Sequence, residues 1–256
     1  MNKILKIFFC VLLFSCALNA QEIPAELLGG MLKSDSWVIK RDLQQEIFTG
    51  NVRFDSGMYK LNADKVISNR KNNTVSIIGN AYLFNRLKTG ETIELFSDKI
   101  LFNTKNRKGS ASKVQNPVNI IYQMPEEYKL DILSNYAHID GIKSTINLKE
   151  DVKIKYTTPA SFILGYADSA FIDRANRNAV FEGSVEFDNT EYTLYAGKVS
   201  YEGSKNEITI ERNYPLILAA NEDITGALQS DFIKINTLTK KVHARGRVSG
   251  WVAPSN

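Results

Sequence analysis

The sequence predicts an all-β protein, an elongated fold of about fourteen short antiparallel strands between residues 37 and 252. Three observations support this prediction. After Trp37 the chain consists of short alternating apolar runs separated by clusters of Asn, Gly, Lys and Asp, which is the pattern of strands and turns. Two short sequence elements recur alternately along the chain. Helical signals are confined to residues 23–31, where Gly29 and Gly30 would end a helix of one or two turns.

The composition is that of a folded globular protein. The chain has 256 residues, of which 43% are hydrophobic and 23% are charged. This size allows one or two domains, and no linker rich in Pro, Gly or Ser divides residues 37–252, so we predict a single β-repeat domain there. The formal net charge is +4. Nucleic-acid-binding proteins usually carry a much larger basic excess, so nucleic acid is not an expected partner.

Residues 1–20 have the layout of a signal peptide. Lys3 and Lys6 give a positive start, residues 7–18 are an almost unbroken apolar run, and Ala20 offers a small residue before a cleavage point. The run is shorter than the roughly 20 apolar residues that span a membrane. We therefore predict export into the periplasm with cleavage after Ala20, leaving residues 21–36 as a short lead-in and residues 253–256 as a tail.

Two alternatives concern the same segment. The peptide Leu13-Phe14-Ser15-Cys16 resembles a lipobox, which would make the chain a lipoprotein attached through Cys16, and the segment could also remain as an uncleaved anchor. Cys10 and Cys16, the two cysteines of the chain, both lie in this segment. A chain cleaved after Ala20 therefore has no disulfide, and its stability must come from a sizeable core or a continuous sheet.

The first recurring element is an apolar residue, a spacer, Ala or Ser, and then Asp, Asn or Gly. An apolar residue or Ala follows two positions after the fourth residue, one step out of the alternation of a regular strand. A β-bulge or a corner at the fourth position restores the apolar side, and Asp, Asn and Gly suit such a bend. The copies are Leu61-Asn62-Ala63-Asp64, Leu95-Phe96-Ser97-Asp98, Ile132-Leu133-Ser134-Asn135, Gly165-Tyr166-Ala167-Asp168, Leu194-Tyr195-Ala196-Gly197 and Leu228-Gln229-Ser230-Asp231.

The second element is a Gly followed by one residue and then Val or Ala. Its copies are about 29 to 37 residues apart when degenerate copies are included, a period that fits a supersecondary unit of a repeat protein. Each repeat is then a two-strand unit, and six to seven units stack on their neighbours. The clear copies are Gly50-Asn51-Val52, Gly79-Asn80-Ala81, Gly183-Ser184-Val185 and Gly246-Arg247-Val248, and the degenerate ones are Asn116-Pro117-Val118, Glu150-Asp151-Val152 and Tyr214-Pro215-Leu216.

These motifs resemble those of the OstA-like family, the LptA-like periplasmic proteins of lipopolysaccharide transport. The likeness is strongest in Ile47-Phe48-Thr49-Gly50-Asn51-Val52 and in Tyr59-Lys60-Leu61-Asn62-Ala63-Asp64-Lys65-Val66, and later repeats keep the skeleton along nearly the whole chain. The resemblance implies an open, V-shaped β-jellyroll whose apolar interior holds lipid acyl chains. It also implies lipopolysaccharide or a similar glycolipid as ligand, and related OstA-like domains of inner- and outer-membrane transport components as partners. The chain carries more repeats than compact family members, so both the bridging protein and the membrane-anchored component remain as alternatives.

An apolar trough has a simple physical basis, because burying an acyl chain gains about 0.8 kcal/mol per methylene. The alternative is a structural envelope protein in which the same residues form a closed core without a ligand. The residues predicted to line the trough are Leu61, Val66, Leu95, Ile100, Phe102, Ile132, Ile139, Phe171, Leu194, Val199, Leu228 and Ile233.

The sequence carries no motif for catalysis or for metal or nucleotide binding. The two histidines, His138 and His243, lie about three repeats apart and pair with no carboxylate at metal-ligand spacing. The recurring Asp of the first element appears once per repeat, which is typical of a structural turn residue. We therefore predict a protein that is not an enzyme and uses no cofactor.

The turns fall into two sets if the strands alternate up and down. The set that follows the first element is basic, and we expect it to rim the trough and meet the phosphates of an anionic glycolipid. The alternative is that these charges only keep the edge soluble. The basic candidates are Arg70, Lys71, Lys105, Arg107, Lys108, Arg174, Arg177, Lys240 and Lys241, with Lys143 and Lys205 beside them. The opposite set contains Asp55, Glu91, Glu126, Glu127, Asp188, Glu191, Glu222 and Asp223, with Arg86 and Lys88 as exceptions.

The terminal strands are predicted at residues 37–54 and 242–252. Unpaired edge strands pair readily with another chain, so these segments are expected to mediate head-to-tail contacts with further copies or with related domains. The alternative is that edge charges shield them; the candidates are Lys40, Arg41, Arg245 and Arg247.

Overall fold

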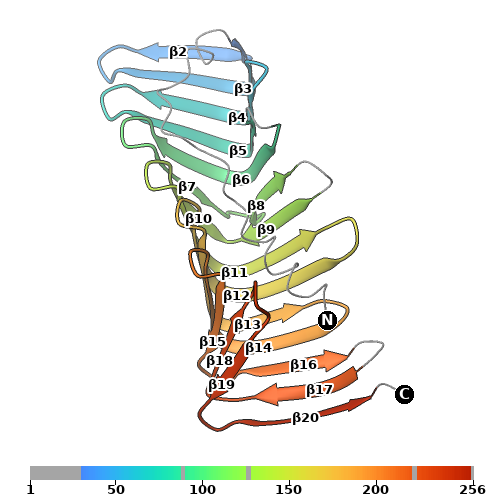
Figure 1. Cartoon of the computed structure of the whole chain (residues 1–256). Coiled ribbons are helices and arrows are strands. Elements are labelled where there is room, and N and C mark those ends of the chain that lie inside the picture. Colours follow the sequence, from blue (N-terminus) through green and yellow to red (C-terminus); the bar gives the residue numbers. More distant parts are fainter. Residues whose placement is uncertain (1–29, 88–89, 125–127, 221–223, 255–256) are drawn as a thin grey trace. The chain divides into compact units, whose positions relative to one another are not determined.

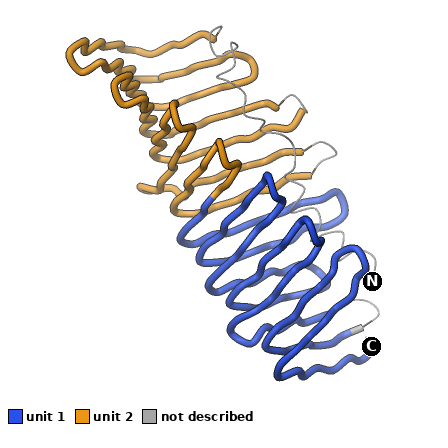
Figure 2. The backbone as a smooth tube through the Cα atoms, turned by 60° about the vertical axis from the view of Figure 1, so that its left-hand side comes forward, with its two compact units in different colours: residues 1–16, 147–256 blue, residues 17–146 orange. Residues whose placement is uncertain are grey.

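The computed structural model describes residues 30–254 except 88–89, 125–127 and 221–223, and every regular element in this part of the chain is a β-strand (Figure 1). The all-β prediction is therefore confirmed. The described residues form two compact units, which meet in sequence between Ile146 and Asn147 (Figure 2). The predicted signal peptide, residues 1–20, lies outside the described residues.

The N-terminal unit is built from antiparallel strands. They are β1 (Met31–Lys33), β2 (Ser36–Lys40), β3 (Gln45–Asp55), β4 (Tyr59–Asn69), β5 (Thr74–Arg86), β6 (Thr92–Asn103), β7 (Lys108–Ser112), β8 (Val118–Gln123), β9 (Lys129–Ser134) and β10 (Tyr136–Asp140).

The C-terminal unit has the same antiparallel construction. Its first strand, β11 (Thr145–Thr157), begins just before the boundary between the units. The remaining strands are β12 (Phe162–Asp173), β13 (Asn178–Asp188), β14 (Tyr192–Glu202), β15 (Glu207–Glu211), β16 (Leu216–Ala220), β17 (Ile224–Gln229), β18 (Phe232–Asn236), β19 (Val242–Arg245) and β20 (Ser249–Pro254).

Several short strands are halves of one longer strand that is broken at a bend. Strand β6 pairs with β7 along one half and with β8 along the other, so β7 and β8 together make one pass beside β6. The same relation holds for β1 and β2 against β3, for β9 and β10 against β8 and β7, and for β15 and β16 against β14. It holds again for β17 with β18 and for β19 with β20. Counted in this way, the twenty strands are the fourteen passes that the sequence predicts.

The strands belong to one continuous sheet, and the passes bend near their middle, which divides the sheet of each unit into two halves, here called arm A and arm B. In the N-terminal unit β2, β7 and β10 belong to arm A, and β1, β8 and β9 belong to arm B. In the C-terminal unit the corresponding strands are β15, β18 and β19 in arm A, and β16, β17 and β20 in arm B. Long strands cross from one arm to the other, and their pairing shifts register at the crossing, for example between Ile78 and Ala81 of β5.

The corner between the arms is made by the Asp of the first element and the Gly of the second. Gly79 has φ +74°, and a Cβ atom there would lie 2.2 Å from Oδ2 of Asp64, so the carboxylate occupies the space that a side chain would need. Asn80 follows with φ +45°, and its Nδ2 donates to Asp64 Oδ2 at 3.1 Å. The predicted bend is therefore confirmed. The same Asp–Gly contact occurs at Asp35 with Gly50, Asp168 with Gly183, and Asp231 with Gly246.

The corner at Asp98 is made differently, because Lys113 stands where the other corners have Gly. The backbone N–H groups of the next three residues, Val114, Gln115 and Asn116, donate to Asp98 Oδ2 at 2.7, 2.6 and 2.8 Å. These backbone hydrogen bonds lower the pKa of Asp98 from 3.8 to about 2. At this corner three backbone hydrogen bonds to the carboxylate stand in place of the Asp–Gly contact.

Candidate lipid-binding site

The inner face of the N-terminal unit can be read from the strand registers, because directly paired residues of neighbouring antiparallel strands point to the same side. One inner row of arm A is Trp37, Phe48, Val66, Ile77, Ile100, Ala111 and Ala137. One inner row of arm B is Leu32, Phe54, Leu61, Leu83, Leu95, Ile120 and Ile132. Every member of both rows is apolar.

Exposure changes along these two rows. Trp37 and Leu32, at the N-terminal edge, are 59% and 44% exposed. Phe54 and Leu61 are half-buried, whereas Ile132, at the other end of the arm B row, is 2% exposed. The inner face of this unit is therefore exposed at β1 and β2, mostly half-buried at β3 and β4, and filled by its own side chains at β8 and β9.

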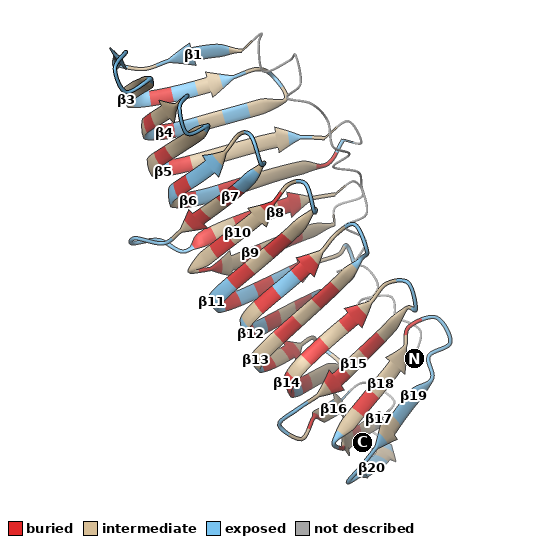
Figure 3. Ribbon diagram, turned by 90° about the vertical axis from the view of Figure 1, so that its left-hand side faces the viewer, coloured by how far each residue is buried: buried red, intermediate tan, exposed pale blue. Residues whose placement is uncertain are grey.

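The C-terminal unit has the corresponding inner rows, and its buried residues alternate along the strands (Figure 3). The arm A row is Ala170, Phe181, Val199, Ile210, Ile233 and Ala244. The arm B row is Gly165, Phe187, Leu194, Ile217, Leu228 and Gly250.

A ring contact shows that the inner faces of the two arms are turned toward each other in the C-terminal unit. Phe181 and Phe187 lie on the same strand, β13, on either side of the corner glycine, Gly183. In a straight strand their Cα atoms would be about 20 Å apart. Their ring centroids lie 5.0 Å apart in an edge-to-face arrangement, which requires the strand to fold back on itself.

Most residues predicted to line the trough do lie on the inner face. The rows above contain Leu61, Val66, Leu95, Ile100, Ile132, Leu194, Val199, Leu228 and Ile233. Phe102 and Ile139 belong to the next inner row of arm A, in which both are paired with Gly109. These positions agree with lining residues, and their part in lipid binding stays a prediction.

The assignment of Phe171 to the trough was wrong. Phe171 pairs with Val180 in a row on the outer face and is 37% exposed, whereas Ala170 and Ile172 on either side of it are buried. The bulge between Tyr166 and Ser169 shifts the alternation by one step, so the small Ala170 points inward and the larger phenyl ring points out.

Sequence reasoning missed the inner residues of the glycine-containing strands. They stand two positions before and four positions after the corner glycine, one in each arm. Counting from Gly183 in this way would have found Phe181 and Phe187, whose rings are in contact in the interior of the C-terminal unit. The pairs are Phe48 with Phe54, Ile77 with Leu83, Phe181 with Phe187, and Ala244 with Gly250.

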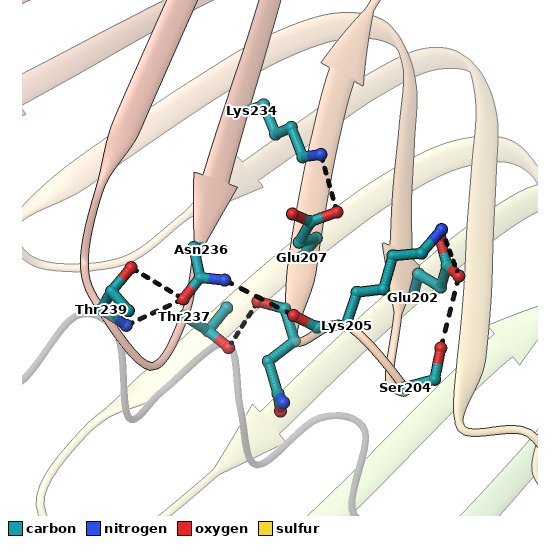
Figure 4. Close-up of polar contacts among 9 residues, drawn as sticks. Glu202, Ser204, Lys205, Glu207, Lys234, Asn236, Thr237 and Thr239 are labelled. Atoms are coloured by element: carbon teal, nitrogen blue, oxygen red, sulfur yellow. Dashed lines mark hydrogen bonds and ion pairs between the residues drawn. The ribbon is translucent and has the colours of Figure 1, made fainter.

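The basic turns lie at the ends of the arm A strands, away from the corner. A residue with positive φ closes each of these turns, and an Asn or Asp at the end of the preceding strand caps most of them. Neighbouring turns are joined by backbone hydrogen bonds such as Thr104 N to Asn73 O, at 2.8 Å, and Gly141 N to Arg107 O, at 2.9 Å. Figure 4 shows the turn that contains Lys205. The Asn236 side-chain amide donates to the Lys205 carbonyl, and the Thr237 hydroxyl donates to the carbonyl of the next residue, Asn206. The turns therefore form one rim within each unit.

Ion pairs already engage some of the basic candidates. Arg70 is paired with Glu46, and Lys108 Nζ lies 3.3 Å from Oδ2 of the nearly buried Asp140. Lys205 is bound by Glu202 at 2.8 Å, which raises the pKa of Lys205 and lowers that of Glu202. Arg107 and Arg174 are half-buried. The exposed candidates outside these three ion pairs are Lys71, Lys105, Lys143, Arg177, Lys240 and Lys241.

The opposite set of turns lies at the ends of the arm B strands. Asp55 and Asp188 accept local hydrogen bonds from Gly57 N–H and from the Thr193 hydroxyl, at 2.7 Å each. Glu91 is nearly buried. The remaining members include Glu126, Glu127, Glu222, Asp223 and Lys88, which lie outside the described residues.

The terminal strands carry exposed apolar side chains. Trp37 on β2 is 59% exposed and stacks on Phe48 with ring centroids 5.9 Å apart, and Trp251 on β20 is 58% exposed. The charges predicted to shield the C-terminal edge contact the chain itself. Arg245 lies over the Phe232 ring at 4.2 Å, and the guanidinium of Arg247 binds Asp231 Oδ1 through Nε and a terminal nitrogen at 3.0 and 2.8 Å.

In the described part of the chain there is no helix long and apolar enough to span a membrane. Fold and inner face together define the class of protein: an open antiparallel β-jellyroll whose two arms turn apolar rows toward each other.

Comparison with known proteins finds a family model that matches part of the chain. Residues 31–155 match the family model described as LptA/(LptD N-terminal domain) LPS transport protein. The chain is also similar to LptH of Pseudomonas aeruginosa, described as the LptA homologous periplasmic component of the lipopolysaccharide transport device, with 9% identity and a TM-score of 0.23 over 90% of this chain and 100% of that one. No curated protein matches the chain. Residues 31–155 thus match the family of LptA and LptD N-terminal domains, and the OstA-like resemblance inferred from the motifs is confirmed.

Proposed function

We propose that this chain is a periplasmic lipid-binding protein that carries or bridges lipopolysaccharide between the inner and outer membranes, with the acyl chains lying against its inner rows. The observation that carries the proposal is the unbroken apolar inner face of the N-terminal unit, which is exposed at β1 and β2 and mostly half-buried at β3 and β4. An acyl chain of about a dozen methylenes would gain on the order of 10 kcal/mol there before entropy costs. The family match over residues 31–155 supports lipopolysaccharide as the lipid.

The first experiment measures whether the inner face accepts an acyl chain. A fluorescent twelve-carbon fatty acid is titrated into the purified protein, and lipid A is then used as the competitor. We expect saturable binding that lipid A displaces. Replacing the exposed inner residue Trp37 by Glu should weaken binding, whereas Lys33→Glu, on the outer face of β1, should not. Absence of saturable binding would favour the alternative, a structural envelope protein with a closed core.

The exposed basic turns are proposed to meet the phosphates of the glycolipid, since Lys acts as a point charge and Arg can grip phosphate with two donors. The reversals K71E, K105E and R177E change three exposed turn residues and leave the Lys108–Asp140 pair intact. A matched control, K99E, K113E and K149E, makes the same charge change at exposed residues near the corners.

We expect the turn variant to bind lipid A more weakly than the corner variant, with little effect on an uncharged lipid of equal chain length. The difference should shrink at high salt, because exposed charges are screened within about 8 Å at physiological ionic strength. Equal losses for the two variants, or for the two lipids, would remove the basic rim from the mechanism.

The terminal strands are proposed as the contacts to further copies or to related domains of the inner- and outer-membrane components. Edge strands with exposed apolar side chains favour such pairing. Deleting residues 242–256 should reduce association measured by light scattering but retain most lipid binding. Unchanged association would contradict this role. A membrane-anchored component of the same transport system is the second candidate, and membrane fractionation of the native protein distinguishes it from a freely periplasmic one.

A further inference from the structure

The inner face of the C-terminal unit is not uniform along its strands. In β12–β14 the inner residues Phe187 and Leu194 of arm B are 6% and 5% exposed. In β16 and β17 the next residues of the same row, Ile217 and Leu228, are half-buried, and Gly250 on β20 is exposed. The space between the arms is therefore filled at β12–β14 and becomes accessible from β16 onward.

The same change occurs in arm A. Ala179, Tyr201 and Ile208 form part of an inner row and are 1%, 6% and 1% exposed. That row continues through Ile235, which is half-buried, to Val242, which is 55% exposed. Both arms thus open toward the same strands.

Phe187 is the side chain that fills the gap at the boundary. Its ring contacts Phe181 of the opposite arm edge-to-face at 5.0 Å. It also lies over Gly165, its directly paired neighbour on β12. A Cβ atom on Gly165 would lie 2.6 Å from the Phe187 ring, so this glycine leaves the room in which the ring sits. The Phe187 ring is therefore held between Gly165 on the neighbouring strand and the Phe181 ring on the other arm, and it closes the interior at β12 and β13.

We propose that Phe187, seated over Gly165 and closed by Phe181, is a plug that ends the acyl-binding trough of the C-terminal unit. The inference rests on the proposed function. Acyl chains bind along β16–β18, and the interior at β12–β14 admits none unless the ring of Phe187 moves. Phe187 is thus a residue that limits how far a lipid enters this unit.

The test uses the full protein and dodecanoic acid that carries a diazirine at its terminal carbon. After irradiation, the labelled peptides are mapped by mass spectrometry. For the unmodified chain we expect label on the inner residues of β16–β18 and of β3–β4, and none on β12 or β13. In Phe187→Ala the label should extend to Gly165 and Leu194 with several-fold higher yield, because an emptied apolar cavity stays dry and accepts apolar ligands.

The matched control is Phe171→Ala, which removes the same ring from the outer face of β12 and should leave the label pattern unchanged. Phe187→Leu is a second variant for use if the Ala variant is unstable, because it removes less side-chain volume. Urea titration verifies that each variant is folded. Label on β12 and β13 of the unmodified chain would overturn the inference alone. An unchanged pattern in folded Phe187 variants would also overturn it. Absence of label along the whole chain would refute the proposed function and this inference with it.

Discussion

The corner at Asp98 gives a sharp test of how charge folds this chain. The substitution Asp98→Asn keeps the shape of the side chain but removes the negative charge that accepts hydrogen bonds from Val114, Gln115 and Asn116. These three N–H groups belong to a corner without a glycine, where the Asn116 side-chain amide also donates to Asp98 Oδ1 at 3.3 Å. We expect the variant to be less stable at neutral pH.

The magnitude follows from the pKa of Asp98, which is lowered from 3.8 to about 2. This lowering of the pKa corresponds to about 2 kcal/mol of folding stability at neutral pH if solvent screening is ignored. Because the corner lies near solvent, screening reduces the contribution, and we expect a loss of about 1 kcal/mol in the free energy of unfolding. The folded-state pKa lies below the unfolded value, so the contribution is complete above pH 4 and is lost as the pH falls through about 2.

The assay is urea unfolding of the two proteins at several pH values between 2 and 7, with the free energies compared at each pH. The difference in free energy of unfolding between the two proteins should be constant from pH 7 to about pH 5 and should become smaller below pH 4. Asp64→Asn is the matched control, because that carboxylate packs against a glycine and accepts a side-chain amide instead of three backbone groups. A gap that is absent at pH 7, or that does not change between pH 4 and pH 2, would refute the reasoning.

Three further predictions concern the corner glycines, the face assignment and the C-terminal edge. Gly79→Ala should lower the free energy of unfolding by about 2–4 kcal/mol, since it combines φ +74° with a clash at 2.2 Å. Gly57→Ala, at φ +81° with nothing within 4 Å, should lower it by about 1 kcal/mol. Equal losses in urea unfolding would show that backbone conformation alone matters. Ile210→Ala, at a fully buried inner position, should lower the free energy of unfolding by about 2–5 kcal/mol, and Phe171→Ala should lower it by about 1 kcal/mol or less. If thermal unfolding shows the Phe171 variant to be the less stable of the two, the assignment of faces is wrong. Arg247→Lys removes a two-donor contact with its aspartate, so amide hydrogens of β19 and β20 should exchange faster, and unchanged exchange would show that the contact does not hold this edge.

The corners could be predicted from the sequence because their chemistry is local. The Asp of one strand and the Gly of the next recur at a fixed spacing, and together they specify a bend whatever the neighbouring repeats contain. Asp64 and Gly79 are an example. The basic turns were predictable for the same reason, since a capping Asn or Asp and a final residue of positive φ lie within five residues of each other. The number of passes follows from these local signals.

The face of each side chain was harder to predict, because it depends on pairing across strands. Alternation predicts an inner position for one of Ala170 and Phe171, and hydrophobicity favours the phenylalanine. The register shift in β12 selects the alanine instead. The contact between Phe181 and Phe187 was equally hidden, because it joins two arms whose approach follows only after the strand has folded at its corner.

The corner and the interior therefore serve separate purposes in this chain. The corner fixes two positions in each glycine-containing strand that point across the gap between the arms. The pairs along the chain are Phe48 with Phe54, Ile77 with Leu83, Phe181 with Phe187, and Ala244 with Gly250. The C-terminal pair has almost no side-chain volume and stands where the inner residues become exposed, whereas Phe181 and Phe187 stand where they are buried. A single repeated backbone thus carries side chains of very different volume across the gap between the arms, because a substitution at either fixed position does not involve the Asp and Gly of the corner that holds the arms together.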